Sequence, residues 1–213
     1  MVSTLLAPAA ALTFLFGWNN SAFLIGNIRG SGTLTLRGAL LTAVVGLLAG
    51  VFVEGPKMLR SLDGFLSPAA SITTLAITLV ASIVVTLGFT SFNLPVSFTA
   101  AMVGAFLGAT YQSGLPINLG QTELVISFWF VAPLVTGVLT FLLYNGVARL
   151  VSSFGILTVD SINRVGVVVS SLAVSYSLGA NNIGLIYGTA SGTFAGFPSC
   201  TLPSYIRPAR LRF

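Results

Sequence analysis

The distribution of charge constrains the fold of this chain more than any other feature of its sequence. Residues 1–28, 64–122 and 124–148 contain no charged side chain, and only 6% of all residues are charged. Soluble domains carry about 25% charged residues. About 20 apolar residues span a bilayer as a helix, whereas a lone strand would leave its backbone polar groups unsatisfied in lipid. The pattern therefore predicts an all-α polytopic membrane protein.

The apolar runs predict about five transmembrane helices and one shorter segment. We expect the spans at about 4–28, 35–53, 68–89, 124–150 and 165–187. The shorter segment has 15 residues from Pro95 to Ala109, a length more typical of a re-entrant or interfacial helix than of a full crossing. The charged residues at 57–63 and 160–164 are interpreted as water-facing turns.

Two of the apolar runs are interrupted by adjacent asparagines. The interruptions are Gly17-Trp18-Asn19-Asn20 and Gly179-Ala180-Asn181-Asn182. An unpaired amide in hydrocarbon costs roughly 2–7 kcal/mol, so a segment that only spans the membrane is not expected to contain such a pair. We expect both segments to be broken helices that form a binding site. The alternative is that the asparagines only hold neighbouring helices together, with hydrogen bonds worth about 0.6–2 kcal/mol.

The two interruptions align in one register, 162 residues apart (179 − 17), which also pairs Gly26 with Gly188 and Gly30 with Gly192. This register predicts an internal repeat. Broken segments at corresponding positions of two halves are typical of secondary transporters. A helix end attracts anions through its free N–H groups, and asparagine offers both a donor and an acceptor. The copies would be parallel if the short segment re-enters, and inverted if it crosses.

Three motifs resemble those of the inorganic phosphate transporter (PiT) family. Its signature begins Gly-Ala-Asn-Asp and leads into a Gly-Ser-Gly turn, which is similar to Gly17-Trp18-Asn19-Asn20 followed by Gly30-Ser31-Gly32. Its second motif, Pro-Val-Ser-Thr-Thr-His, opens a re-entrant helical hairpin and is similar to Pro95-Val96-Ser97-Phe98-Thr99. Gly179-Ala180-Asn181-Asn182 resembles the second copy of the first motif.

The resemblance implies a secondary transporter in which two inverted repeats build one central site for inorganic phosphate. Sodium ions or protons drive transport in that family, and sulfate permeases are relatives. The implied substrate-binding residues come from both asparagine pairs and from the start of the short helix: Asn19, Asn20, Ser97, Thr99, Asn181 and Asn182. A coupling sodium ion would lie near Asn20 and Asn182.

The sequence departs from the family motifs at positions that bear on coupling. Asn20 and Asn182 stand where the family has aspartate, and Phe98 and Ala100 replace a threonine and a histidine. The departures remove the obvious carboxylate ligands for sodium and the obvious proton carriers. The four remaining acids all lie near predicted span ends, where we interpret them as solvated interface charges: Glu54, Asp63, Glu123 and Asp160.

The predicted organisation is a first transporter repeat at 1–150, an incomplete second repeat at 151–193 and a non-helical basic tail at 194–213. No second Pro-Val-Ser segment follows Gly192. We therefore expect a homo-oligomer or a partner polypeptide to supply the missing half. The alternatives are a truncated, non-transporting fragment and a sulfate permease.

Composition excludes several other classes of function. The chain has no histidine and a single cysteine, Cys200, and its serines lack a candidate general base. An enzyme is not expected, and neither is a cofactor. The net charge of +5 lies at the ends of apolar runs, which favours lipid headgroups over nucleic acid as partners. We expect a multi-pass protein of the cell membrane.

Overall fold

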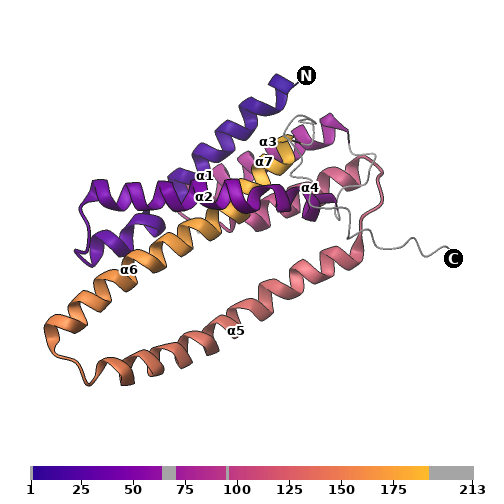
Figure 1. Cartoon of the computed structure of the whole chain (residues 1–213). Helices are drawn as coiled ribbons and strands as arrows, with labels where there is room; N and C mark the ends of the chain where they lie inside the picture. The colour runs from indigo at the N-terminus through magenta and orange to yellow at the C-terminus, as the bar shows by residue number, and fades with distance from the viewer. Residues whose placement is uncertain (1, 64–70, 95, 192–213) are drawn as a thin grey trace, which may run out of the picture.

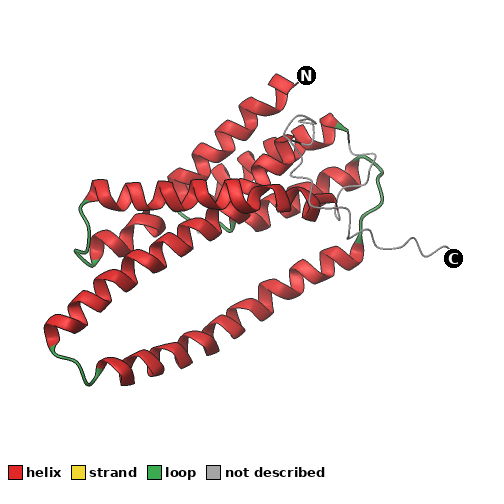
Figure 2. Ribbon diagram, viewed as in Figure 1, coloured by secondary structure: helices red, strands yellow, loops and turns green. Residues whose placement is uncertain are grey.

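The computed structural model describes residues 2–63, 71–94 and 96–191. Its helices are α1 (Val2–Gly30), α2 (Leu36–Asp63), α3 (Ile72–Ser91), α4 (Phe98–Gln112), α5 (Leu119–Val151), α6 (Ile156–Leu178) and α7 (Gly184–Ser191), with a π-helical turn at Gly179–Ile183. No strand occurs in this part of the chain (Figure 2). The predicted tail 194–213 and Pro95 lie outside the described residues.

Four helical stretches of the described chain are long and apolar enough to cross a membrane. They are Leu36–Gly55, Ile72–Ser91, Leu119–Val151 and Ile156–Ala190. Helix α1 is long enough at 29 residues but is not among the four, because Pro8, Asn19 and Asn20 dilute its apolar stretch. The expected five spans correspond to these four stretches and α1. The prediction of an all-α polytopic membrane protein is confirmed.

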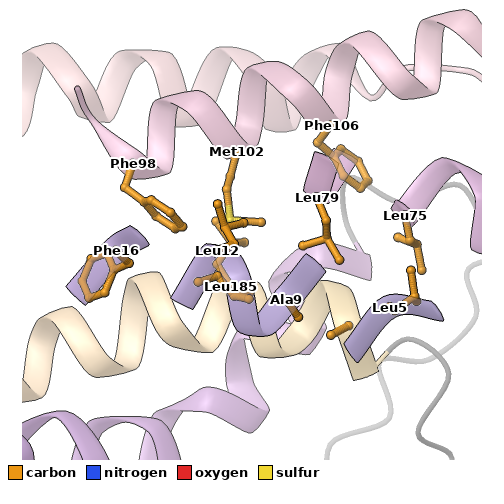
Figure 3. Packing of buried hydrophobic residues seen from close by; sticks show 12 residues of the cluster. Leu5, Ala9, Leu12, Phe16, Leu75, Leu79, Phe98, Met102, Phe106 and Leu185 are labelled. Atoms are coloured by element: carbon orange, nitrogen blue, oxygen red, sulfur yellow. The ribbon is translucent and has the colours of Figure 1, made fainter. Parts of the chain in front are cut away.

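The hydrophobic core joins α1, α3, α4 and α7 (Figure 3). One face of α1 contributes Leu5, Ala9, Leu12 and Phe16, which recur at three- and four-residue intervals and so lie on one side of the helix. Each helix of the group adds buried side chains to the same cluster, namely Leu75 and Leu79 from α3, Phe98, Met102 and Phe106 from α4, and Leu185, Ile186 and Ala190 from α7. This packing fixes the start of α4 relative to the π turn.

Helix α2 packs against α6 and the π turn through glycines that allow the backbones to approach closely. A Cβ added to Gly46 would lie 2.6 Å from the Cβ of Ser175. A Cβ added to Gly50 would overlap the carbonyl oxygen of Tyr176, and one added to Gly179 would overlap that of Leu47. Small residues at four-residue spacing are a common way for membrane helices to associate. Gly46 and Gly50 have this spacing, which was not recognised from the sequence.

Helices α3 and α4 form an antiparallel hairpin. The chain turns after α3 through Asn93, whose φ is 54°, a left-handed conformation that asparagine tolerates. At the other end, the hydroxyls of Thr74 and Ser113 lie 3.1 Å apart. Helix α4 therefore returns to the level at which α3 begins, although its 15 residues extend only about 22 Å. Whether it re-enters the membrane stays a prediction.

The chain directions match those of inverted copies. Helix α1 runs away from the N-terminus towards the end of the molecule where α6 starts, and α6 and α7 run back in the opposite direction (Figure 1). Because α4 returns beside α3, four helices separate the two asparagine pairs along the chain, an even number. The repeat itself stays a prediction.

Helix α5 lies apart from the bundle (Figure 1). None of the side chains of this 33-residue helix is buried. Its apolar surface would contact lipid or another polypeptide when the chain is in a membrane.

Three local expectations are corrected by the structure. Helix α1 is unbroken through Asn19 and Asn20, because lipid offers the backbone no substitute for its helical hydrogen bonds. The second interruption is a π turn within a continuous helical course. The expected water-facing turns are helical, since α2 continues to Asp63 and α6 already includes Asp160 and Arg164 as an ion pair one turn apart.

The close contact between α2 and the π turn makes Gly179 sensitive to substitution. Gly179→Ala should lower the melting temperature of the purified protein, because overpacking of this kind costs about 1–3 kcal/mol. Gly137→Ala in α5 is the matched control, since a Cβ added there meets nothing within 4 Å. Thermal unfolding in detergent, followed by size-exclusion chromatography, measures both variants. Equal melting temperatures would contradict the proposed packing.

Candidate functional site

Two residues predicted to bind substrate are in direct contact. The Thr99 hydroxyl donates a hydrogen bond to Oδ1 of Asn182 at 2.8 Å, although the two residues are 83 positions apart in the sequence. Asn182 is 5% exposed, and Thr99 is half-buried. The bond therefore joins the start of α4 to the π turn inside the bundle.

Ser97 begins α4 and is exposed. Its hydroxyl caps the helix by accepting from the backbone N–H of Ala100 at 3.4 Å. The first backbone N–H groups of a helix have no partner within it. The start of α4 thus presents N–H donors and hydroxyls on the same side of the bundle as Asn182.

The π turn determines how the second asparagine pair is presented. Gly179 lies against the backbone of Leu47 in α2, and the turn admits one additional residue per hydrogen-bonded ring compared with an α-helix. Asn182 is buried towards α4, whereas Asn181 lines an open pocket with residues of α2 and α6. The two adjacent side chains therefore lie in different environments.

The first asparagine pair is not joined to the second by hydrogen bonds between described residues. Asn20 donates from Nδ2 to the carbonyl oxygen of Phe16 at 3.0 Å, within its own helix. Asn19 and Asn20 are both half-buried. The link to α4 is aromatic, because the rings of Phe16 and Phe98 meet edge to face with centroids 5.2 Å apart.

Glu54 makes a contact between helices that the sequence did not indicate. Its carboxylate forms an ion pair with Lys57 at 2.7 Å and accepts a hydrogen bond from the Tyr176 hydroxyl at 3.3 Å. The interpretation as a solvated interface charge did not anticipate the contact with α6. A tyrosine three residues before the second glycine–asparagine motif was the one available signal.

The contact between α4 and the π turn leaves the amide N–H groups of Asn182 out of its hydrogen bond. The contact with Thr99 uses only the side-chain oxygen of Asn182, and an asparagine amide carries two N–H donors. Among the described residues, no group of three acidic, histidine or cysteine side chains is positioned to hold a metal ion. The sodium site expected near Asn20 and Asn182 stays a prediction.

Comparison with known families decides the classification. A family model described as "Phosphate transporter family" matches residues 16–197. The chain belongs to this phosphate transporter family. The resemblance read from the motifs is therefore confirmed, and the match includes both asparagine pairs and the Ser97–Thr99 segment. The protein is a multi-pass membrane protein.

Two curated relatives both carry the name "Putative phosphate permease". The protein from Haemophilus influenzae is 23% identical over 150 residues, which cover 66% of this chain and 36% of the relative. The protein from Methanocaldococcus jannaschii is 24% identical over 178 residues, which cover 84% of this chain and 56% of the relative. The chain thus spans about a third to a half of the relatives' length. No solved structure gives a significant match.

The hydrogen bond between Thr99 and Asn182 should contribute measurably to stability. Thr99→Val keeps the shape of the side chain but removes the donor, and should cost about 0.6–2 kcal/mol. Thr99→Ser keeps the hydroxyl and serves as the control. Thermal unfolding in the same detergent compares the three proteins. If Thr99→Val and Thr99→Ser have the same melting temperature, the hydrogen bond does not hold the π turn to α4.

Proposed function

We propose that this chain is part of an ion-coupled secondary transporter of inorganic phosphate or a related oxyanion. The single observation that carries the proposal is the hydrogen bond from Thr99 to Asn182. It brings together two motifs, 83 residues apart, that the resemblance to the phosphate transporter family implies for one binding site. Membership of the phosphate transporter family supports the choice of phosphate.

The proposed anion site combines several kinds of hydrogen-bond donor. Ser97 supplies a hydroxyl, the start of α4 supplies free N–H groups and the positive end of the helix dipole, and the asparagines supply amide N–H groups. The single O–H of Thr99 is donated to Oδ1 of Asn182, so Thr99 contributes by positioning that amide. Asn182 is the central residue of this proposal, with Asn19 and Asn20 contributing from the other repeat, whereas Asn181 lines a separate pocket with residues of α2 and α6. The role is binding and release of an anion, not catalysis of a reaction.

The site also needs a second half. In the described chain only one helix, α4, begins with a Ser-Phe-Thr segment beside an asparagine pair. The two curated relatives are longer than the matched region. A partner half or a second copy of this chain would supply a hairpin for Asn19 and Asn20. We place the assembled transporter in the cell membrane.

Uptake by reconstituted protein tests the proposal. The purified chain in liposomes should accumulate labelled phosphate above empty vesicles, and Asn182→Ala should reduce the rate at least tenfold because the site loses its buried amide. Asn145→Ala is the matched control, since Asn145 lies on exposed α5 and its amide bonds only to the carbonyl oxygen of Phe141.

Two outcomes would favour the alternatives. Preferential uptake of labelled sulfate would make the protein a sulfate permease. No uptake of either anion by monodisperse protein would identify the isolated chain as a non-transporting fragment.

The missing carboxylates generate a separate prediction about coupling. If Asn20 and Asn182 occupy the coupling positions, Asn20→Asp or Asn182→Asp should make phosphate uptake depend on sodium, because a carboxylate supplies the hard oxygen ligands that such cations prefer. Uptake is measured in sodium and in choline buffers. Sodium-independent uptake by both variants would contradict this assignment of the two positions.

A further inference from the structure

An open pocket of about 450 Å³ lies beside the π turn and is lined by Asn181 but not by Asn182 or Thr99. Helix α2 provides its charged wall, and α6 together with the π turn provides its polar wall. The lining residues are Glu54, Lys57, Met58, Tyr176, Ser177, Ala180 and Asn181. Asn182, Ser97 and Thr99, which are proposed to form the anion site, are not among them.

The pocket already holds a positive charge. The Lys57 ammonium lies 2.8 Å from Oε1 and 2.7 Å from Oε2 of Glu54, so it bridges both carboxylate oxygens. Glu54 also accepts from the Tyr176 hydroxyl, which comes from a helix 122 residues further along the chain. The carboxylate is therefore fixed from two helices, and among the described side chains its counter-charge is the tethered ammonium of Lys57.

The Lys57 ammonium can leave the Glu54 carboxylate. Its side chain is 68% exposed, compared with 33% for Glu54, and an exposed ion pair between flexible side chains is weak. If the ammonium moves into water, the Glu54 carboxylate is left without its counter-charge, beside the Tyr176 hydroxyl and in a pocket that Ser177 and Asn181 also line. Carboxylate, hydroxyl and amide oxygens are the ligands of hard cations.

We propose that this pocket binds a monovalent cation, which replaces the Lys57 ammonium on Glu54. One carboxylate balances one positive charge, which favours a monovalent ion over a divalent one. The oxygens of Tyr176 and Asn181 complete the coordination. The site is distinct from the positions of Asn20 and Asn182, and cation binding there does not depend on whether the chain transports an anion.

The location gives the pocket a direct connection to the proposed anion site. Asn181 lines the pocket, and its neighbour Asn182 accepts the hydrogen bond from Thr99. A cation that draws in the Asn181 oxygen would act on the same π turn that holds Asn182. Lys57 competes with that cation, so the charge of the pocket stays neutral in both states.

Direct binding of radioactive sodium to the purified full chain in lipid nanodiscs tests the proposal, at constant ionic strength maintained with choline. Glu54→Gln should lower the affinity at least tenfold. Lys57→Ala should raise it about two- to fivefold, because the competing ion pair is weak. Tyr176→Phe should lower it severalfold while retaining the ring. Asp160→Asn, which removes the carboxylate of the exposed pair with Arg164, should leave it unchanged.

Size-exclusion profiles and helical circular dichroism identify any variant that fails to fold, and Lys57→Ala then decides the question because it predicts a gain. The proposal is overturned if neither the parent protein nor Lys57→Ala binds sodium, or if Glu54→Gln binds it as tightly as the parent. Because binding is measured without transport, absence of phosphate uptake would count against the proposed function and not against the cation site.

Discussion

The close approach of α2 to the π turn is the constraint on which the arrangement of polar residues depends. Gly46, Gly50 and Gly179 allow the two backbones to meet where any side chain would separate them. That contact fixes the rotation of the turn about its axis. As a result, one asparagine lies in the bundle beside Thr99 and the next lines the pocket with Glu54. The placement of the polar side chains around the turn thus depends on three glycines, which have no side chain of their own.

Much of the architecture is readable from sequence because a bilayer permits few solutions. A long uncharged apolar run forms a helix in lipid because a lone strand would leave its backbone polar groups unsatisfied, and the asparagine pairs mark the segments in which a site is expected. Whether those segments are broken cannot be read from the sequence, because an asparagine amide in a membrane can find hydrogen-bond partners in several ways. Asn20 bonds to its own helix, whereas Asn182 bonds to a distant threonine. Similar motifs therefore lead to an unbroken helix in one case and a π turn in the other.

Glu54 illustrates a second limit of sequence reasoning. An acid at the end of an apolar span is most often solvated, and neighbouring residues do not indicate otherwise. Its contact with Tyr176 arises only when α2 and α6 cross, and that crossing depends on glycines that are common throughout the chain. The contact of Thr99 was easier to anticipate, because the family resemblance implied one shared anion site for the motif that contains it and the motif that contains Asn182.

The isolation of α5 gives the protein a sensitivity to the thickness of its membrane. A helix of 33 residues is about 50 Å long, whereas the hydrocarbon core measures about 30 Å. Because none of its side chains is buried against the described residues, packing within that part of the chain does not set its inclination, and the helix can tilt to match the bilayer. Its two ends are tied by short loops to α4 and α6. A change in bilayer thickness would therefore alter the separation of the helices that carry Thr99 and the π turn. Through this separation, the lipid composition of the membrane would affect the geometry of the site.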